Sequence, residues 1–245
     1  MIIEQKNLNY YEQIKPKMMK EFELMYKGTK SLLLEYFNES NVESLYHKSK
    51  EVYISLFPKL PYIGGKKNSQ TINLIMGAIV LAIIIPLENE SLSKHQIGKT
   101  IFDTFRMYFD TNPKFILRLV GKYFLTPFST RRMKKDMEKS LERKYKEDFV
   151  MEHVQSGSGQ FDFGYNYLEC ALHKLYTKNN LLKYLPYVCL GDYALFRSLG
   201  IGFSRTQTIA NGGKLCDFRF KKHGETLYGW PPEKHKEWNV LNNEK

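Results

Sequence analysis

Residues 184–222 have the sequence YLPYVCLGDYALFRSLGIGFSRTQTIANGGKLCDFRFKK, and this stretch decides the second half of the fold. Pro186 suits the first turn of a helix, and Gly200 is the residue type that commonly ends one. The alternating segments on either side of Asn211-Gly212 predict two strands, because Asn-Gly favours the centre of a two-residue hairpin. We therefore expect a helix, a strand, a tight turn and a second strand.

The turn length sets which side chains share a face of this hairpin. A two-residue turn pairs the following residues: Gln207 with Cys216, Arg205 with Phe218, and Phe203 with Phe220. A three-residue loop would place Thr206 and Thr208 on that face instead. Both registers stay open, and both bring polar groups onto an otherwise aromatic surface.

Arg205 needs a partner if its guanidinium lies on an apolar sheet face. The carboxylate of Asp192 is the nearest candidate in the sequence, and pairing with it is the default expectation. The functional alternative is a substrate carboxylate, which a guanidinium can hold through two parallel hydrogen bonds.

Cys189 and Asp192 are the residues of this stretch that could carry chemistry. We expect Cys189 in the first turn of its helix, where the helix dipole favours a thiolate. Asp192 lies three residues further along the same face and could activate water or orient a reacting group. Inert packing is the more common role of a lone cysteine. The three cysteines (Cys170, Cys189, Cys216) could converge on a metal, but they lack the CxxC grouping of zinc sites. We assign no metal ligand and predict no cofactor, and whether a metal participates stays open.

Upstream of this stretch the periodicity of apolar residues changes from four to two near residue 147. Residues 149–155 and 161–168 alternate around SGSGQ, which predicts a hairpin, and a helix from about residue 170 to 177 follows. Before it, the patterns predict helices that include an apolar one at 72–87 and amphipathic ones at 93–109 and 129–147.

These elements predict an α+β fold in which a helical N-terminal part packs on a small antiparallel four-stranded sheet with two covering helices. The expected boundaries are residues 1–146 for the helical part, 147–222 for the α+β part with the ligand pocket, and 223–245 for a polar, loosely packed tail with Trp230 pinned to the rest.

The chain has 245 residues and a net charge of +11, from 37 basic and 26 acidic side chains. This balance permits binding to nucleic acid or anionic lipid, but no nucleic-acid motif accompanies it, and we predict neither partner. The apolar run 73–87 is shorter than the roughly 20 residues that a membrane span needs. An odd number of cysteines and an N-terminus without a signal-peptide pattern favour a cytoplasmic setting.

The loop LPYIGGKKNSQT at 60–71 combines paired glycines with lysines and an amide. It can be a surface turn ahead of the apolar helix, or an anion-binding loop in which backbone N–H groups face a ligand. Spacing alone favours the turn.

Three motifs in the C-terminal half carry a family resemblance: C-x-x-D at 189–192, R-T-x-T at 205–208 and G-G-x-x-C-D-F-R at 212–219. Together with PYIGGKKN at 61–68, they resemble the L-2-amino-thiazoline-4-carboxylic acid hydrolase family, which strengthens the functional interpretation of the glycine loop. The C-terminal half also looks like the small-molecule-binding domain associated with vinyl reductases, which similarly ends in G-x-x-x-C-x-F.

The resemblance implies ring-opening hydrolysis of a small cyclic sulfur- and nitrogen-containing carboxylate, with a carbamoyl-cysteine-type product. Chemistry then suggests attack by Cys189, or by water activated by Asp192, at the amidine-like carbon. The candidate catalytic residues are Cys189, Asp192 and Cys216, and the candidate substrate-binding residues are Arg205, Gln207, Thr206, Thr208, Gly64, Gly65, Lys66 and Asn68. The alternative is a non-catalytic sensor or binding protein for a small molecule. The oligomeric state stays open.

Overall fold

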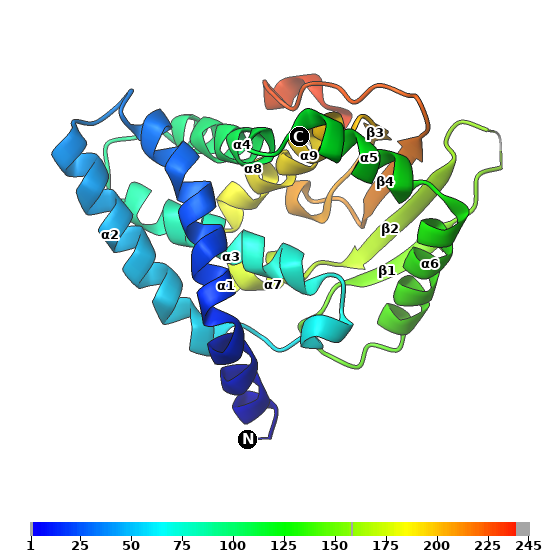
Figure 1. The fold of residues 1–245 in the computed structure, drawn as a ribbon, viewed down its shortest axis with the longest axis horizontal. Coiled ribbons are helices and arrows are strands. Elements are labelled where there is room, and N and C mark those ends of the chain that lie inside the picture. Colours follow the sequence, from blue (N-terminus) through cyan, green and yellow to red (C-terminus); the bar gives the residue numbers. More distant parts are fainter. Residues whose placement is uncertain (1, 158, 239–245) are drawn as a thin grey trace.

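The computed structural model describes residues 2–157 and 159–238 (Figure 1). Its helices are α1 (Ile2–Leu33), α2 (Glu39–Leu56), α3 (Thr71–Leu87), α4 (Lys94–Asp110), α5 (Lys114–Phe124), α6 (Pro127–Leu141), α7 (Ala171–Lys178), α8 (Leu185–Cys189) and α9 (Gly191–Leu199). The strands are β1 (Val150–Val154), β2 (Phe163–Glu169), β3 (Gly202–Ser204) and β4 (Cys216–Lys221). The short 3-10 helices are η1 (Phe57–Lys59), η2 (Gly65–Lys67), η3 (Leu182–Tyr184), η4 (Ile209–Asn211) and η5 (Pro232–Lys234). The predicted α+β class is confirmed.

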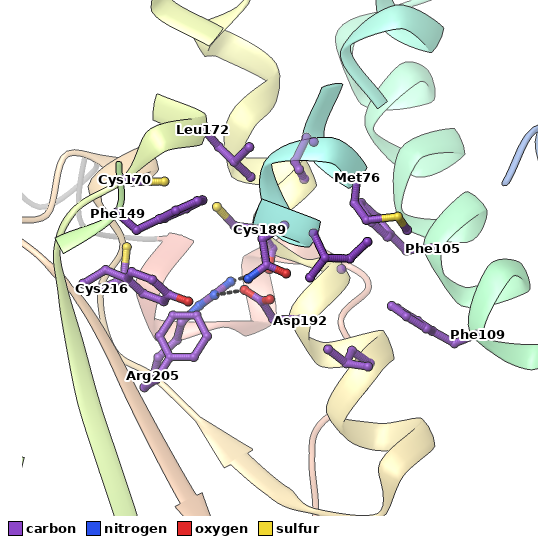
Figure 2. Close-up of a pocket in the computed structure, with 18 of the residues that line it drawn as sticks. Met76, Phe105, Phe109, Phe149, Cys170, Leu172, Cys189, Asp192, Arg205 and Cys216 are labelled. Carbon is purple, nitrogen blue, oxygen red and sulfur yellow. Dashed lines mark hydrogen bonds and ion pairs between the residues drawn. The ribbon is translucent and has the colours of Figure 1, made fainter. Parts of the chain in front are cut away.

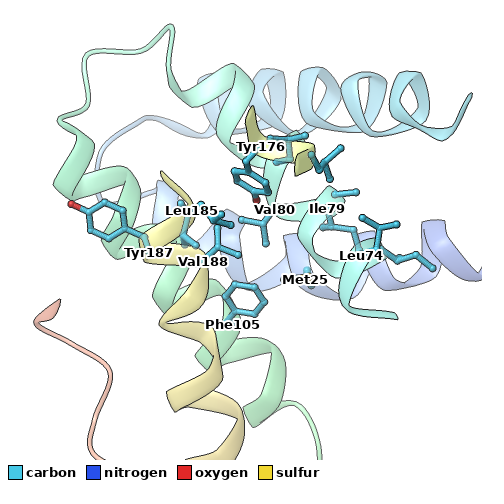
Figure 3. Close-up of a cluster of buried hydrophobic side chains, with 14 of the residues drawn as sticks. Met25, Leu74, Ile79, Val80, Phe105, Tyr176, Leu185, Tyr187 and Val188 are labelled. Carbon is cyan, nitrogen blue, oxygen red and sulfur yellow. The ribbon is translucent and has the colours of Figure 1, made fainter. Parts of the chain in front are cut away.

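Helix α3 is the buried core helix that its uninterrupted apolar sequence predicts. Most of its side chains are inaccessible to solvent, and Figure 3 shows Leu74, Ile79 and Val80 among side chains from α1, α4, α7 and α8. The hydroxyl of Tyr176 in α7 donates to the carbonyl of Gly77 in α3 at 3.0 Å. In the described ranges, no helix combines the length and apolar character needed to cross a bilayer. The core therefore runs without a break from the N-terminal helices into the C-terminal half.

The amphipathic helix predicted at 129–147 is shorter than expected. Helix α6 begins at Pro127, where the side chain of Thr126 caps it, and it ends at Leu141. Arg143 then adopts a positive φ of 51°, which turns the chain away from the helix axis. Tyr145, the last residue of the four-residue pattern, instead packs edge-on against the ring of Tyr62.

The sheet has the strand order β1-β2-β4-β3 and is antiparallel throughout. The hairpin predicted from the SGSGQ segment is β1 and β2. Helix α9 covers the sheet through Phe196, whose ring lies 4.8 Å from those of Phe203 and Phe220. Helix α5 adds Phe124 to the same cluster, so one helix from the first half of the chain helps to cover the sheet.

The final hairpin keeps the register of the predicted two-residue turn where its strands pair, but the pairing is shorter than expected and the turn itself is different. Phe203 does pair with Phe220, but β3 ends at Ser204, and Arg205 has left the ladder. The carboxylate of Asp217 accepts hydrogen bonds from the backbone N–H groups of Thr206 and Gln207 and from the Thr206 hydroxyl, all at 2.8 Å. Such side-chain bonds compete with strand pairing. They hold residues 205–215 in a broad loop that contains η4 and not a tight Asn-Gly turn.

The C-terminal segment is not the loosely packed tail that its composition suggests. His235 and Glu237 are 2% and 0% exposed. Trp230 is held as expected, with ring contacts to His95, Phe102 and Tyr187. The rest of the predicted tail, residues 239–245, lies outside the described residues.

Candidate functional site

A cavity of about 320 Å³ lies where α3, α4 and the helices α7 to α9 meet strands β2 and β4 (Figure 2). Its walls are mostly aromatic and aliphatic: Ile72, Met76, Phe105, Tyr108, Phe109, Phe149, Leu172, Val188, Leu195 and Phe218. Few polar side chains enter it: Asn73, Tyr167, Cys170, Cys189, Asp192, Arg205 and Cys216. A largely apolar pocket with a small convergent polar set is typical of a small-molecule site.

The cavity brings together four residues that the sequence singled out: Cys189, Asp192, Arg205 and Cys216. Cys189 belongs to α8 and Asp192 to α9. Arg205 lies in the loop that follows β3, and Cys216 is the first residue of β4. Only Leu190 separates α8 from α9, and the thiol and the carboxylate of the C-x-x-D motif both face the cavity, as Figure 2 shows.

Arg205 is held by four hydrogen bonds. Nε and Nη2 donate to the two carboxylate oxygens of Glu237 at 2.6 and 2.7 Å, Nη1 donates to Asp192 Oδ2 at 2.6 Å, and Nη2 donates to the carbonyl of Cys189 at 2.7 Å. The side chain is 1% exposed. Four of the five guanidinium N–H groups are therefore used within the chain. The expected ion pair between Arg205 and Asp192 is present. The one remaining N–H group cannot hold a substrate carboxylate through two parallel hydrogen bonds.

Asp192 is the carboxylate that the cavity exposes. Its side chain is 34% exposed, whereas that of Glu237 is fully buried. Burial raises the pKa of Asp192 above its ordinary value of 3.8, the Arg205 guanidinium lowers it, and the charge of Glu237 raises it. A carboxyl group with a raised pKa in an apolar cleft is a typical proton-transfer group.

Three thiols line the cavity, and all are disfavoured as thiolates. Burial raises the pKa of Cys170 to about 11 and that of Cys216 to about 12, and it raises the pKa of Cys189 well above 9.0. The expectation that the helix dipole activates Cys189 is wrong, because Cys189 is the last residue of α8 and not in its first turn. Within residues 2–157 and 159–238, no three His, Cys, Asp or Glu side chains are grouped to hold a metal.

The other residues predicted from the final hairpin do not line this cavity. Thr206 and Gln207 bind Asp217 through the loop described above. Thr208 is fully buried and its hydroxyl accepts a hydrogen bond from the N–H of Asn211, which caps η4. In this structure all three shape the loop that carries Arg205.

The glycine loop also lies outside this cavity. Gly64 and Gly65 have φ values of 114° and 57°, and the Asn68 amide donates to the Ile63 carbonyl and to Asp148. Gly64 and Asn68 line a second cavity of about 320 Å³ between this loop and the end of α6. Gly65 and Lys66 line a third, next to α1. The structure therefore does not bring the loop together with Asp192.

Three functional candidates are missing from the predictions made from the sequence. Asn73, in the first turn of α3, lines the cavity. Glu237 lies in a polar stretch where no periodicity marks it, yet it is the most buried partner of Arg205 and also accepts a hydrogen bond from the Tyr193 hydroxyl at 2.8 Å. Tyr167 lies in β2 and lines the cavity, and its hydroxyl donates to Gln70 Oε1 at 3.0 Å. The period-two pattern of β2 could have indicated which face Tyr167 occupies.

A family model described as L-2-amino-thiazoline-4-carboxylic acid hydrolase matches residues 73–220 of the chain. The matched region includes Asn73, Cys189, Asp192 and Arg205, while Glu237 lies beyond it. No curated protein and no solved structure matches the chain.

Proposed function

This chain belongs to the L-2-amino-thiazoline-4-carboxylic acid hydrolase family, and on that basis we propose that it is a hydrolase that opens a small cyclic sulfur- and nitrogen-containing compound beside Asp192. The observation that carries the proposal is the position of Asp192. It is exposed to an apolar cavity, it has a raised pKa, and a buried arginine that is itself fixed by Glu237 orients it.

Asp192 acts in this proposal as a general base and then as a general acid. Its carboxylate takes one proton from water as the water oxygen bonds to the amidine-like carbon, and it passes that proton to the ring nitrogen, whose double bond to carbon becomes single. The hydroxyl of the tetrahedral carbon then gives up its proton. Asp192 transfers this proton to the leaving ring nitrogen or sulfur while the C–N or C–S bond breaks and a carbonyl forms. The sum is one water added and one ring opened.

Water is a better candidate nucleophile than Cys189. A thiol whose pKa is well above 9.0 carries little thiolate at neutral pH, and covalent attack needs the thiolate. The neutral thiols of Cys170, Cys189 and Cys216 instead provide soft, weakly polar walls, which suit a ligand that contains sulfur.

A substrate carboxylate, if present, is not held by Arg205 in this proposal, because four of the five guanidinium N–H groups already have acceptors. The Asn73 amide lines the cavity and uses one of its two N–H groups on Gln70, so the other can donate to a ligand, whereas the single proton of the Tyr167 hydroxyl is already given to Gln70. In this proposal the amidine-like group of the ligand therefore faces Asp192, and the binding of the ligand does not depend on a bidentate ion pair with an arginine.

The test is turnover of 2-aminothiazoline-4-carboxylate and of 2-aminothiazoline, with mass spectrometry of the products. The expected product has the mass of the substrate plus one water. Asp192→Asn is expected to lower turnover about 100-fold or more while ligand binding, followed by calorimetry, stays within a few-fold, since proton transfer contributes roughly 100- to 10,000-fold. The matched control is Asp136→Asn on α6, which lines the second cavity. Ligand binding without a ring-opened product would reject the hydrolase and favour a binding protein.

A further inference from the structure

Helix α5 carries an apolar face that the fold leaves uncovered. The described part of the chain contains 13 large apolar side chains that are exposed, and six of them lie between residues 115 and 128. They are Phe115 (68%), Ile116 (43%), Leu119 (59%), Val120 (48%), Tyr123 (50%) and Phe128 (69%). A contiguous exposed patch of this kind marks an interaction site.

The exposed face is separate from the face that α5 uses inside the protein. Phe124 points inward, and its ring lies 5.7 Å from that of Phe196 and 5.1 Å from that of Phe220. Gly121 lets α5 approach the end of α9, because a Cβ there would lie 2.0 Å from the carbonyl oxygen of Leu199. One side of α5 thus packs against α9 and the sheet. The apolar side chains on its other side contact no other part of the described structure closely enough to be buried.

Every charged residue of α5 and of the first half of α6 is basic. Residues 111–135 contain seven basic and no acidic residues: Lys114, Arg118, Lys122, Arg131, Arg132, Lys134 and Lys135. All seven are exposed, and none forms an ion pair with another described residue. Lys114, Arg118 and Lys122 recur every four residues, one position before Phe115, Leu119 and Tyr123, so a basic row borders the apolar face along the helix.

No lipid partner is predicted from the sequence, but on the strength of this exposed face we propose that α5 and the start of α6 form a surface that lies on an anionic lipid bilayer. A helix with an apolar face, bordered by Lys and Arg and carrying aromatic side chains, is suited to the boundary between headgroups and acyl chains. The anionic headgroups complement the seven unpaired cations, and the acyl region takes the side chains of Phe115, Leu119 and Phe128. The net charge of +11 acts in the same direction. This is attachment to one leaflet and involves no membrane span.

Other occupants fit the same face less well. A twofold dimer would bring the basic rows of both copies to the edges of one interface, with no acidic side chain of this face to pair with them, because an isologous interface uses the same patch on both copies. A nucleic acid would satisfy the cations but would leave Ile116, Leu119 and Val120 without an apolar partner. A peptide helix needs a hydrophobic groove, and none of the three cavities described above is lined by a residue of this face.

The experiment is flotation of the full chain with vesicles of phosphatidylcholine alone or with about one third phosphatidylserine. Wild type is expected to float with the anionic vesicles only, and less so as salt is raised. Lys122→Gln with Arg131→Gln should lower the partition constant about 25-fold, given about five-fold for each basic residue near the surface. Phe115→Ser with Leu119→Ser should lower it at least about ten-fold, since apolar burial contributes to such binding.

Matched controls keep the result interpretable. Leu227→Ser removes a side chain that is 64% exposed elsewhere, and Lys20→Gln with Lys59→Gln removes two exposed cations far from α5 in sequence. Both should bind within about two-fold of wild type, and thermal melts should show that every variant is folded. Absence of flotation, equal flotation with neutral vesicles, or equal losses in the controls would overturn the proposal. A dimer in sedimentation that Phe115→Ser with Leu119→Ser dissociates, without vesicle binding, would assign the face to a second copy.

Discussion

Arg205 and Glu237 form a two-bond ion pair that is buried on both sides. The guanidinium Nε and Nη2 lie 2.6 and 2.7 Å from the carboxylate oxygens, and the two side chains are 1% and 0% exposed. The pair links the loop after β3 to the C-terminal segment. Burying two charges costs about as much free energy as their attraction returns, so we regard this pair as a positioning device. It holds the guanidinium that orients Asp192 in the cavity wall.

Replacing Glu237 tests that role through stability. Glu237→Gln leaves the buried guanidinium of Arg205 with one of its two ionic partners, and we expect the free energy of unfolding to fall by about 3 kcal/mol. The matched control is Glu233→Gln, an exposed residue in the same segment, which should change it by less than about 0.5 kcal/mol. Urea unfolding measures both. Equal stability of the two variants would contradict a structural role for the pair.

The pH profile of turnover reports the ionisation of Asp192. Burial raises the pKa of Asp192 above 3.8, so a base in this position loses activity as the pH falls through that raised value. The charge of Glu237 contributes to the rise, and its removal in Glu237→Gln should move the acid limb of kcat/KM to lower pH. The measurement is kcat/KM from about pH 4 to 8 on protein shown to be folded. An acid limb that stays in place in the variant would exclude Asp192 as the titrating base.

The thiols should react slowly in the native protein. Raising the pKa of Cys170 from 9.0 to about 11 lowers its thiolate fraction about 100-fold at neutral pH. The pKa values of Cys189 and Cys216 are raised as well, so all three should alkylate far more slowly than in urea. Iodoacetamide labelling followed by peptide mass spectrometry gives the rate for each cysteine. Rapid alkylation of Cys189 alone in the native protein would instead support Cys189 as a covalent nucleophile.

Lys66→Ala separates the glycine loop from the Asp192 cavity. Lys66 is exposed and lines a different cavity, so the substitution should leave ligand affinity within about two-fold of wild type. Asn73→Ala removes one of the few polar groups that do line the Asp192 cavity and should weaken binding about ten-fold, the effect of about one hydrogen bond. Calorimetry with 2-aminothiazoline-4-carboxylate compares the two. The opposite ranking would place the ligand at the loop, as the sequence analysis proposed.

The sequence determined those features that depend on near neighbours. The apolar run at 72–87 predicted a buried helix and the alternation around SGSGQ predicted a hairpin, and both are present. The three-residue spacing of C-x-x-D predicted that Cys189 and Asp192 face the same side, and both line the cavity although they belong to consecutive helices. Each follows from periodicity within one or two elements.

Only the tertiary structure decided how charged and titratable groups are surrounded. Glu237 reaches Arg205 across 32 residues of chain, and Asp217 diverts residues 205–215 from the strand pairing that Asn-Gly predicts. The raised pKa values of the three thiols likewise depend on burial by several helices and strands. Desolvation and ion pairing are properties of what packs around a group, and residue types at local spacing carry no information about that packing.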